Sequence, residues 1–183
     1  LGIINNESLK KAPELTVVES KWNLGNTLIF DIKNSRRIMR LGYLDAMKAI
    51  GVFDGSYYTF AKGSFNKTDC KMADACAYIF QISPTLIYTE KTFAELLSPA
   101  VNNARKNLEE AVESFKTNKM KLLGASDMIK NLKEVSNSQI ICFIIAENLK
   151  EKGADSIFLK RSMVRLFPQQ LLAARFLVKY DMV

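Results

Sequence analysis

The residues with the clearest chemical potential are four cations in the stretch KNSRRIMR, namely Lys33, Arg36, Arg37 and Arg40. On a helix, their spacing would hold all four within an arc of roughly 100°. Arginine suits phosphate because its planar guanidinium group donates two parallel hydrogen bonds and is weakly hydrated. A surface with such cations binds a phosphate backbone with a salt-dependent affinity that depends little on base sequence. These four residues therefore make a polyanion the first candidate ligand.

Three further groups of basic residues occur later in the chain. They are Lys62, Lys67 and Lys71, then Lys116, Lys119 and Lys121, and finally Lys160, Arg161 and Arg165. Lys and Arg number 26 against 19 Asp and Glu, which gives a formal net charge of +7 and a pI near 9.3. Each group alone has an ordinary explanation, because surface lysines are common and cations stabilise the C-terminal ends of helices. Together, the groups favour anionic partners, nucleic acid above all.

Aromatic residues surround the first of these lysine groups. They are Tyr57, Tyr58, Phe60 and Phe65, placed around a segment at 61–63 that predicts the turn of a small β-hairpin. Unpaired bases stack on exposed aromatic rings, so Tyr58 and Phe60 are candidate contacts for single-stranded nucleic acid. The same rings could instead belong to the hydrophobic core, which is the commoner role of aromatic side chains. The sequence leaves both uses open.

Catalytic groups are difficult to assemble from this composition. The chain has no histidine, which excludes Ser-His and Cys-His nucleophile systems. Ser64 and Lys67 have the Ser-x-x-Lys spacing of penicillin-binding enzymes, but the accompanying Lys-Thr-Gly and Ser-Asp-Asn elements are absent. The acidic pair Glu109 and Glu113 alternates with cations, as expected of the solvated side of an amphipathic helix. We therefore expect a protein that is not an enzyme.

No metal or cofactor site is predicted either. Asp69 and Asp74 could ligate a hard cation, but no third carboxylate lies nearby in the sequence. The glycines do not have the spacing of a phosphate-binding or dinucleotide-binding loop. Cys70, Cys76 and Cys142 lack Cys-x-x-Cys spacing, which predicts reduced, buried thiols rather than a disulfide framework or a zinc site.

The elements that would position these residues are mainly helical. Apolar residues at helical spacing, together with capping and terminating residues, predict eight helices. They span residues 35–50, 68–82, 91–97, 98–119, 126–134, 138–150, 156–166 and 169–180. Strand-like residues occur at 15–20 and 27–32 and in the hairpin. The predicted fold class is mainly α, a two-lobed helical protein with a small β-hairpin in the N-terminal half.

The expected organisation is one domain, or two small lobes that share a core. Residues 1–26 are the least patterned and are interpreted as an N-terminal arm that includes Trp22. We expect a mixed N-terminal lobe over 27–83, a connection over 84–97 and a helical C-terminal lobe over 98–183. No apolar run is long enough to cross a bilayer, and the first residues lack the pattern of a secretory signal. An intracellular protein without a membrane partner is therefore expected.

Three segments around the hairpin resemble nucleoproteins of segmented negative-strand RNA viruses, of the orthobunyavirus and tospovirus kind. The segments are YLDAMKAI at 43–50, YTFAKGSF at 58–65 and TDCKMADACAYI at 68–79. Ala61 stands where those proteins have glycine, and Asp74 and Gln81 stand where they tend to carry basic residues. The resemblance implies two lobes that hold single-stranded RNA between them, and a terminal arm that docks on the next subunit.

The leading hypothesis is a single-stranded RNA-binding protein of nucleocapsid type that holds the phosphate backbone in a basic groove and self-assembles through its N-terminal arm. The predicted contacts are Lys33, Arg36, Arg37, Arg40, Lys62, Lys67, Lys71, Tyr58, Phe60, Arg161 and Arg165. By the resemblance, the hairpin lysines share one cleft with the arginines of 33–40. The alternative is a helical protein–protein interaction module, such as a viral or bacterial adaptor, whose lysines only confer solubility.

Overall fold

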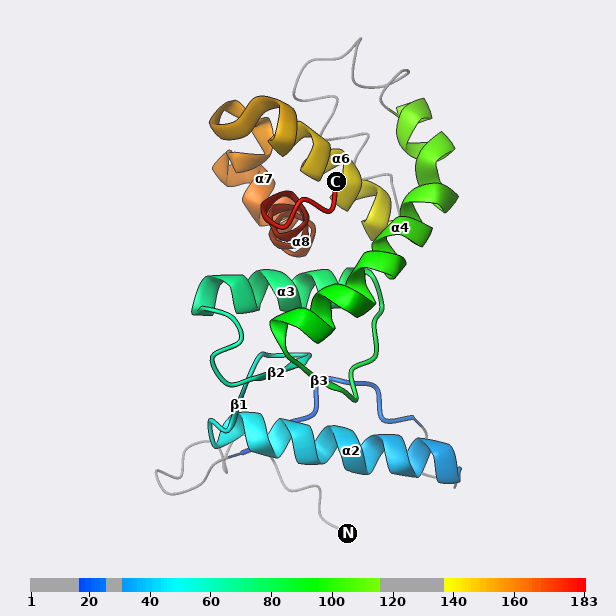
Figure 1. Ribbon diagram of the computed structural model, residues 1–183, viewed down its shortest axis with the longest axis vertical. Helices are drawn as coiled ribbons and strands as arrows, with labels where there is room; N and C mark the ends of the chain where they lie inside the picture. The colour runs from blue at the N-terminus through cyan, green and yellow to red at the C-terminus, as the bar shows by residue number, and fades with distance from the viewer. Residues whose placement is uncertain (1–16, 26–30, 116–136) are drawn as a thin grey trace.

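The computed structural model describes residues 17–25, 31–115 and 137–183 (Figure 1). Its helices are α2 (Ile32–Ala49), α3 (Lys67–Ile79), α4 (Glu90–Phe115), α6 (Ser138–Lys152), α7 (Arg161–Leu166) and α8 (Pro168–Lys179). Two short 3-10 turns, η2 (Gly153–Asp155) and η3 (Ile157–Leu159), join α6 to α7. The mainly α fold class is confirmed, and so is a small β element in the N-terminal half.

A three-stranded sheet lies between α2 and α3 (Figure 1). Its strands are β1 (Phe53–Asp54), β2 (Thr59–Ala61) and β3 (Ile87–Tyr88), in the spatial order β1-β2-β3. β1 pairs antiparallel with β2, and β2 pairs parallel with β3, with Thr59 opposite Ile87. β2 is therefore the central strand, and both Thr59 and Phe60 are fully buried.

A β-hairpin is present, but its turn is not where the sequence predicted it. The predicted turn was 61–63, whereas the turn that joins β1 to β2 lies at 55–58. Gly55 explains this position because its φ is +113° and a Cβ there would lie only 2.1 Å from the Tyr58 carbonyl oxygen. Only glycine meets both conditions. The predicted turn segment instead leads the chain from β2 towards α3.

α3 lies at the centre of the molecule, and most of its side chains are buried as a result. The sheet lies on one side of it and α8 on the other (Figure 1). Ala73 and Ala77 on α3, and Ala173 and Ala174 on α8, are fully buried, and such small side chains let two helices approach closely. A helix that is apolar around most of its circumference is stable only when enclosed in this way.

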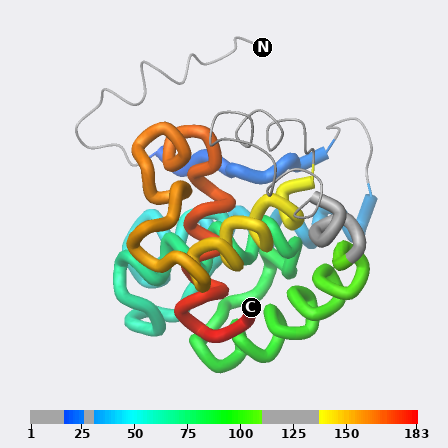
Figure 2. Tube along the Cα trace, turned by 90° about the horizontal axis from the view of Figure 1, so that it is seen from above, coloured from blue at the N-terminus to red at the C-terminus, as the bar shows by residue number. Residues whose placement is uncertain are grey.

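The C-terminal half packs its helices over α3 and shares one core with the N-terminal half. In the view from above, α4 lies along the edge of the group formed by α6, α7 and α8 (Figure 2). Residues 141–146 of α6, within the helix predicted at 138–150, are all buried. A single hydrophobic cluster extends from Tyr58 in the hairpin to Leu177 in α8. None of the described helices is both long enough and apolar enough to span a bilayer.

α2 lies beyond the sheet and is attached along one side. Leu41 and Leu44 are each 1% exposed, whereas other large apolar residues of the same helix are exposed. Lys48 pairs with Asp45 at 2.9 Å and donates to the Ser56 carbonyl oxygen at 2.8 Å. The C-terminal end of α2 is therefore fastened to the hairpin turn.

Several helix boundaries differ from the prediction. The helix expected at 91–97 and the described part of the helix expected at 98–119 form one element, α4, which contains Pro99 and changes direction along its length (Figure 1). The helix expected at 156–166 is interrupted after η3, because Lys160 is extended. The predicted connection at 84–97 contains β3 and the first turns of α4.

The strands predicted at 15–20 and 27–32 lie partly outside the described residues, which lack 15–16 and 27–30. Residues 17–20 form no strand, and Ile32 is the first residue of α2 because the Asp31 carboxylate caps that helix. The helix predicted at 126–134 lies outside the described residues. The helix predicted at 68–82 begins one residue earlier, at Lys67, because the side chain of Asn66 accepts the backbone N–H groups of Thr68 and Asp69, and it ends at Ile79.

The described part of the predicted N-terminal arm packs against its own chain. The Trp22 indole N–H donates to the Tyr57 carbonyl oxygen at 3.1 Å, and its ring meets the Tyr57 and Tyr58 rings edge-on. Residues 1–16 lie outside the described residues. Docking of the arm on a neighbouring subunit therefore stays a prediction.

Candidate functional site

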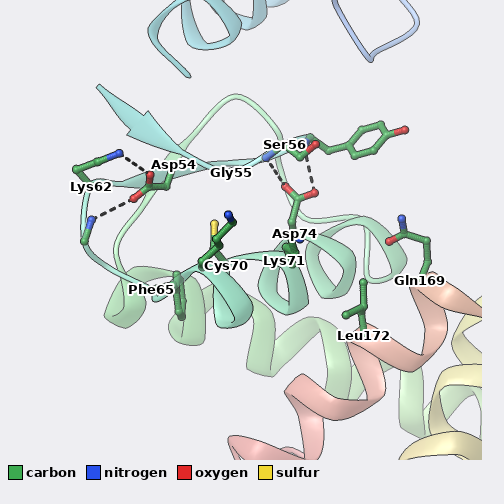
Figure 3. A pocket seen from close by; sticks show the side chains of 13 residues that line it. Asp54, Gly55, Ser56, Lys62, Phe65, Cys70, Lys71, Asp74, Gln169 and Leu172 are labelled. Atoms are coloured by element: carbon green, nitrogen blue, oxygen red, sulfur yellow. Dashed lines mark hydrogen bonds and ion pairs between the residues drawn. The ribbon is translucent and has the colours of Figure 1, made fainter. Parts of the chain in front are cut away.

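A hollow of about 750 Å³ opens between the β1–β2 hairpin, the first turns of α3 and the start of α8 (Figure 3). This volume is within the usual range for ligand-binding pockets. Lys62, Lys67 and Lys71 all line it. The structure therefore brings together the three lysines that the sequence grouped near the hairpin.

One wall of the hollow is the turn at 55–58, which a buried carboxylate holds in place. Asp74 Oδ1 accepts the backbone N–H groups of Ser56 at 3.2 Å and Tyr58 at 2.7 Å, and Oδ2 accepts that of Tyr57 at 3.2 Å (Figure 3). The Asp74 side chain reaches the turn from α3 and is only 8% exposed. Its negative charge is thus directed at backbone donors of the turn.

The three lysines differ in how far their charge is already balanced. Lys62 donates to Asp54 Oδ1 at 2.8 Å, and this bond, with the Gly63 N–H on Oδ2, holds the pKa of Asp54 below its usual value. Lys67 and Lys71 are exposed and lie four residues apart on α3, so they project from the same side of the helix. Neither forms an ion pair with a described carboxylate. A bound anion would therefore meet two cations that remain available.

Apolar side chains complete the hollow. Phe65 lines it from the segment just before α3, and Leu172 lines it from α8 (Figure 3). Cys70 also lines it, but the thiol is a poor nucleophile because burial, the main cause, and the nearby Asp74 charge raise its pKa to about 11. All three cysteines are free and buried, as the sequence predicted.

The predicted stacking role of Tyr58 and Phe60 is wrong. Tyr58 is 2% exposed and Phe60 is 0% exposed, because β2 is the central strand and both rings belong to the core. Burial raises the pKa of the Tyr58 phenol far above its usual value. These rings offer no face to a base in this structure.

Other aromatic rings are more accessible near the hollow. Tyr57 is half-buried and lines the hollow, and Tyr78 is 50% exposed, with its ring centroid 5.2 Å from that of Tyr57. Lys21 lies over the Tyr57 ring at 5.4 Å and donates to the Ser56 hydroxyl. The dipeptide Asp54-Gly55, a typical hairpin-turn sequence, could have identified the correct turn and hence the exposed side of Tyr57.

Known proteins offer no further guide. Comparison with protein-family models, curated proteins and solved structures finds no match to this chain. The resemblance to nucleoproteins of segmented negative-strand RNA viruses therefore stays a prediction.

The four cations predicted on α2 share that helix but do not line the hollow. Lys33 and Arg36 are exposed. Arg37 donates to the Asn23 carbonyl oxygen at 3.1 Å, and Arg40 donates to a carbonyl oxygen of the loop before β3 at 3.0 Å. Two of the four arginine and lysine side chains thus help to attach α2 to neighbouring segments.

One continuous groove lined by all the predicted cations is therefore not formed. α2 lies on the side of the sheet opposite α3 (Figure 1). Lys48 is the α2 residue that contacts the hairpin turn, and Arg40 lies eight residues before it, about 12 Å away along the helix axis. Arg161 and Arg165 are exposed on α7, which contributes no residue to the hollow. The cations form three separate surfaces, on α3 with the hairpin, on α2 and on α7.

The chemistry that this arrangement supports is anion binding. Among residues 17–25, 31–115 and 137–183, no group of three or more His, Cys, Asp and Glu side chains could hold a metal ion. The two carboxylates of the hollow, Asp54 and Asp74, are both engaged in hydrogen bonds to the hairpin. Lys67 and Lys71 are left as the groups that a ligand would meet.

Proposed function

We propose that the chain binds single-stranded RNA through its phosphate backbone, with the hollow beside α3 as the principal contact. The observation that carries the proposal is the pair Lys67 and Lys71, two exposed cations one helical turn apart on a hollow of about 750 Å³. Lys62 adds a third ammonium group, partly balanced by Asp54. Phosphates placed there would neutralise these cations and release counterions.

An unpaired strand suits the hollow better than a duplex does. Phe65 and Leu172 line the same space as the lysines, so a base or ribose can make apolar contacts while its phosphate meets the ammonium groups. Tyr57 adds a half-buried ring for stacking. Because the N–H groups of the turn are taken by Asp74, the turn has few donors left for reading base edges. Binding should therefore depend little on base sequence.

Lys33 and Arg36 on α2 form a separate cationic surface that a longer strand could also reach. Substituting all the α2 arginines would be a poor test, because Arg37 and Arg40 also hold α2 in place. Replacing only Lys33 and Arg36 with alanine avoids that complication, since both are exposed. If α2 makes a second contact with RNA, this double substitution weakens the binding of a long strand more than the binding of a short one.

The direct test is a titration of fluorescently labelled single-stranded RNA, read by anisotropy, from about 50 to about 200 mM salt. The double variant Lys67→Ala, Lys71→Ala is expected to bind at least tenfold more weakly at the lower salt. The slope of log K against log salt should fall by about 1.4, because each lost phosphate contact on a single strand removes about 0.7. The matched control is Lys106→Ala, Lys152→Ala, which removes two exposed lysines away from the hollow.

The net charge change is the same in both double variants, so a general electrostatic attraction would weaken both equally. Equal weakening, or an unchanged affinity of the hollow variant, would place the binding site elsewhere. Absence of binding at the lower salt would contradict the RNA proposal as a whole.

A further inference from the structure

α2 carries a row of apolar side chains on its outer side. Ile32, Met39, Tyr43 and Ile50 are 73%, 67%, 49% and 69% exposed. They follow one another at intervals of seven, four and seven residues, which return to the same side of a helix. The large apolar residues of a helix normally face the core, whereas these four, the α2 outer face, point away from it.

No other described element covers this face. The sheet and α3 lie on the opposite side of α2, where Leu41 and Leu44 are buried (Figure 1). Among the labelled elements α2 is also the outermost in this view, beyond the sheet. A continuous exposed apolar surface on a folded protein indicates a binding surface more often than isolated apolar residues do.

The charged residues that border the α2 outer face are all cations. Lys33, Arg36 and Arg40 lie along one flank, and the Arg40 guanidinium sits over the Tyr43 ring at 5.5 Å. The other flank carries Gly42, Ala46 and Ala49, all exposed. Between 32 and 50 the single acidic residue is Asp45, which is 9% exposed and pairs with Lys48. A partner should therefore bring carboxylates to one side of its own apolar surface.

We infer that the α2 outer face docks an amphipathic helix of a partner protein, with Asp and Glu residues beside its apolar stripe. The small residues Gly42, Ala46 and Ala49 leave room for a helix backbone to approach, and nothing lies within 4 Å of a Cβ added at Gly42. The apolar stripe would supply the contact area and the cations the orientation of the partner. This surface gives the protein-interaction alternative a defined location and does not depend on RNA binding.

A second copy of the chain fits this face less well. Its own α2 would present the same cations, with no exposed carboxylate between 32 and 50 to meet them. Like charges brought together in an interface oppose association. Self-pairing through α2 is therefore an outcome that would contradict the inference.

The test uses the full chain and a synthetic helix of about 18 residues, long enough for five turns. Its leucines recur at three- and four-residue intervals and are bordered by glutamates. In a second peptide, lysines replace the glutamates. The glutamate peptide should bind, by calorimetry, at least tenfold more tightly than the lysine peptide. Met39→Gln with Tyr43→Gln should weaken it at least tenfold, whereas Leu96→Gln, an exposed leucine on α4, should not.

Charge reversal provides the sharper measurement. Arg36→Glu should weaken binding of the glutamate peptide and strengthen binding of the lysine peptide, because it reverses the charge at the border of the face and leaves the apolar residues unchanged. Lys67→Ala with Lys71→Ala should leave peptide binding unchanged, which separates this surface from the RNA site. Unchanged circular dichroism of each variant excludes unfolding as the cause.

Four results would overturn the inference. They are no binding of the glutamate peptide, equal binding of both peptides, a dimer in sedimentation that Met39→Gln with Tyr43→Gln dissociates, or α2-dependent binding to anionic lipid vesicles. The last two would assign the face to a second copy or to a membrane surface.

Discussion

Replacing Asp74 with asparagine is expected to loosen the turn at 55–58 while leaving the helices intact. The carboxylate lies on α3 and accepts three backbone N–H groups, from Ser56, Tyr57 and Tyr58. No residue within the turn provides an equivalent acceptor for these donors among the described hydrogen bonds. The turn also forms one wall of the hollow, so its order bears on ligand binding as well as on stability.

The size of the effect follows from the three hydrogen bonds. The Tyr58 N–H is buried, and leaving such a donor without a partner costs about 1–3 kcal/mol. The Ser56 and Tyr57 N–H groups are part-buried and can reach water, so each loses about 0.5–1.5 kcal/mol. Asp74→Ala removes both acceptor oxygens, and with them all three hydrogen bonds, and should lower the free energy of unfolding by about 3–5 kcal/mol.

The asparagine variant distinguishes the loss of hydrogen bonds from the loss of side-chain volume, because asparagine is about the same size as aspartate. Its Oδ1 can keep the bonds from Ser56 and Tyr58, which both use Asp74 Oδ1, whereas Nδ2 would face the Tyr57 N–H as a second donor. Asp74→Asn should therefore cost about 1–2 kcal/mol, less than alanine does. The control is Asp155→Asn, an exposed carboxylate, which should change stability by less than about 0.5 kcal/mol.

The assay combines urea unfolding with amide hydrogen exchange. Urea unfolding gives the free-energy ranking, and exchange should show faster loss of protection at residues 56–58 in Asp74→Asn, with α6 and α8 unchanged. The reasoning is refuted if asparagine and alanine are equally destabilising, or if protection at 56–58 survives the loss of the carboxylate.

Three further outcomes are expected. Phe60→Ala should lower the free energy of unfolding by about 3–5 kcal/mol in urea, and Tyr78→Ala by about 1 kcal/mol or less, because the first ring is fully buried and the second half exposed; the reverse ranking would contradict the core assignment. Burial raises the pKa of Cys70 from 9.0 to about 11 and that of Tyr88 from 10.0 to about 12, so the folded state holds these protons more tightly. The contribution of these two groups to the free energy of unfolding should be fully present below pH 9 and be lost as pH rises towards 12. A free energy of unfolding that does not change over this range in urea would contradict the prediction. The lowered pKa of Asp54 has the opposite sign: its contribution is present above pH 3.8 and lost as pH falls further, so Asp54→Asn should flatten the acid side of the same profile.

The hairpin shows where sequence reasoning succeeded and where it failed. The lysines of the hollow were grouped correctly because Lys62, Lys67 and Lys71 lie close together in the sequence around the hairpin, although Lys67 falls one residue before the helix predicted at 68–82. Tyr58 and Phe60 were misassigned because a strand's alternation does not tell which of its sides will be covered. β2 became a central strand only through its pairing with β3, which begins 26 residues after Ala61 ends β2.

Asp74 could not have been interpreted from its neighbours in the sequence. It lies on α3 among Ala73, Ala75 and Cys76, and its three donors lie 16 to 18 residues earlier in the chain. Lys179 is a similar case, since it pairs with Asp69 from 110 residues away. Contacts of this length depend on how α3, α8 and the hairpin pack together.

The sequence by itself determined the helical class, the helix that carries Lys71, the reduced cysteines and the cationic character of the chain. Those properties follow from local spacing, capping and composition, which act over a few residues. Tertiary structure decided which cations share a hollow, which aromatic rings are buried and which side of α2 faces away from the other described elements. Each of these depends on contacts between residues distant in the chain, and the free energy that selects those contacts comes from packing the whole core.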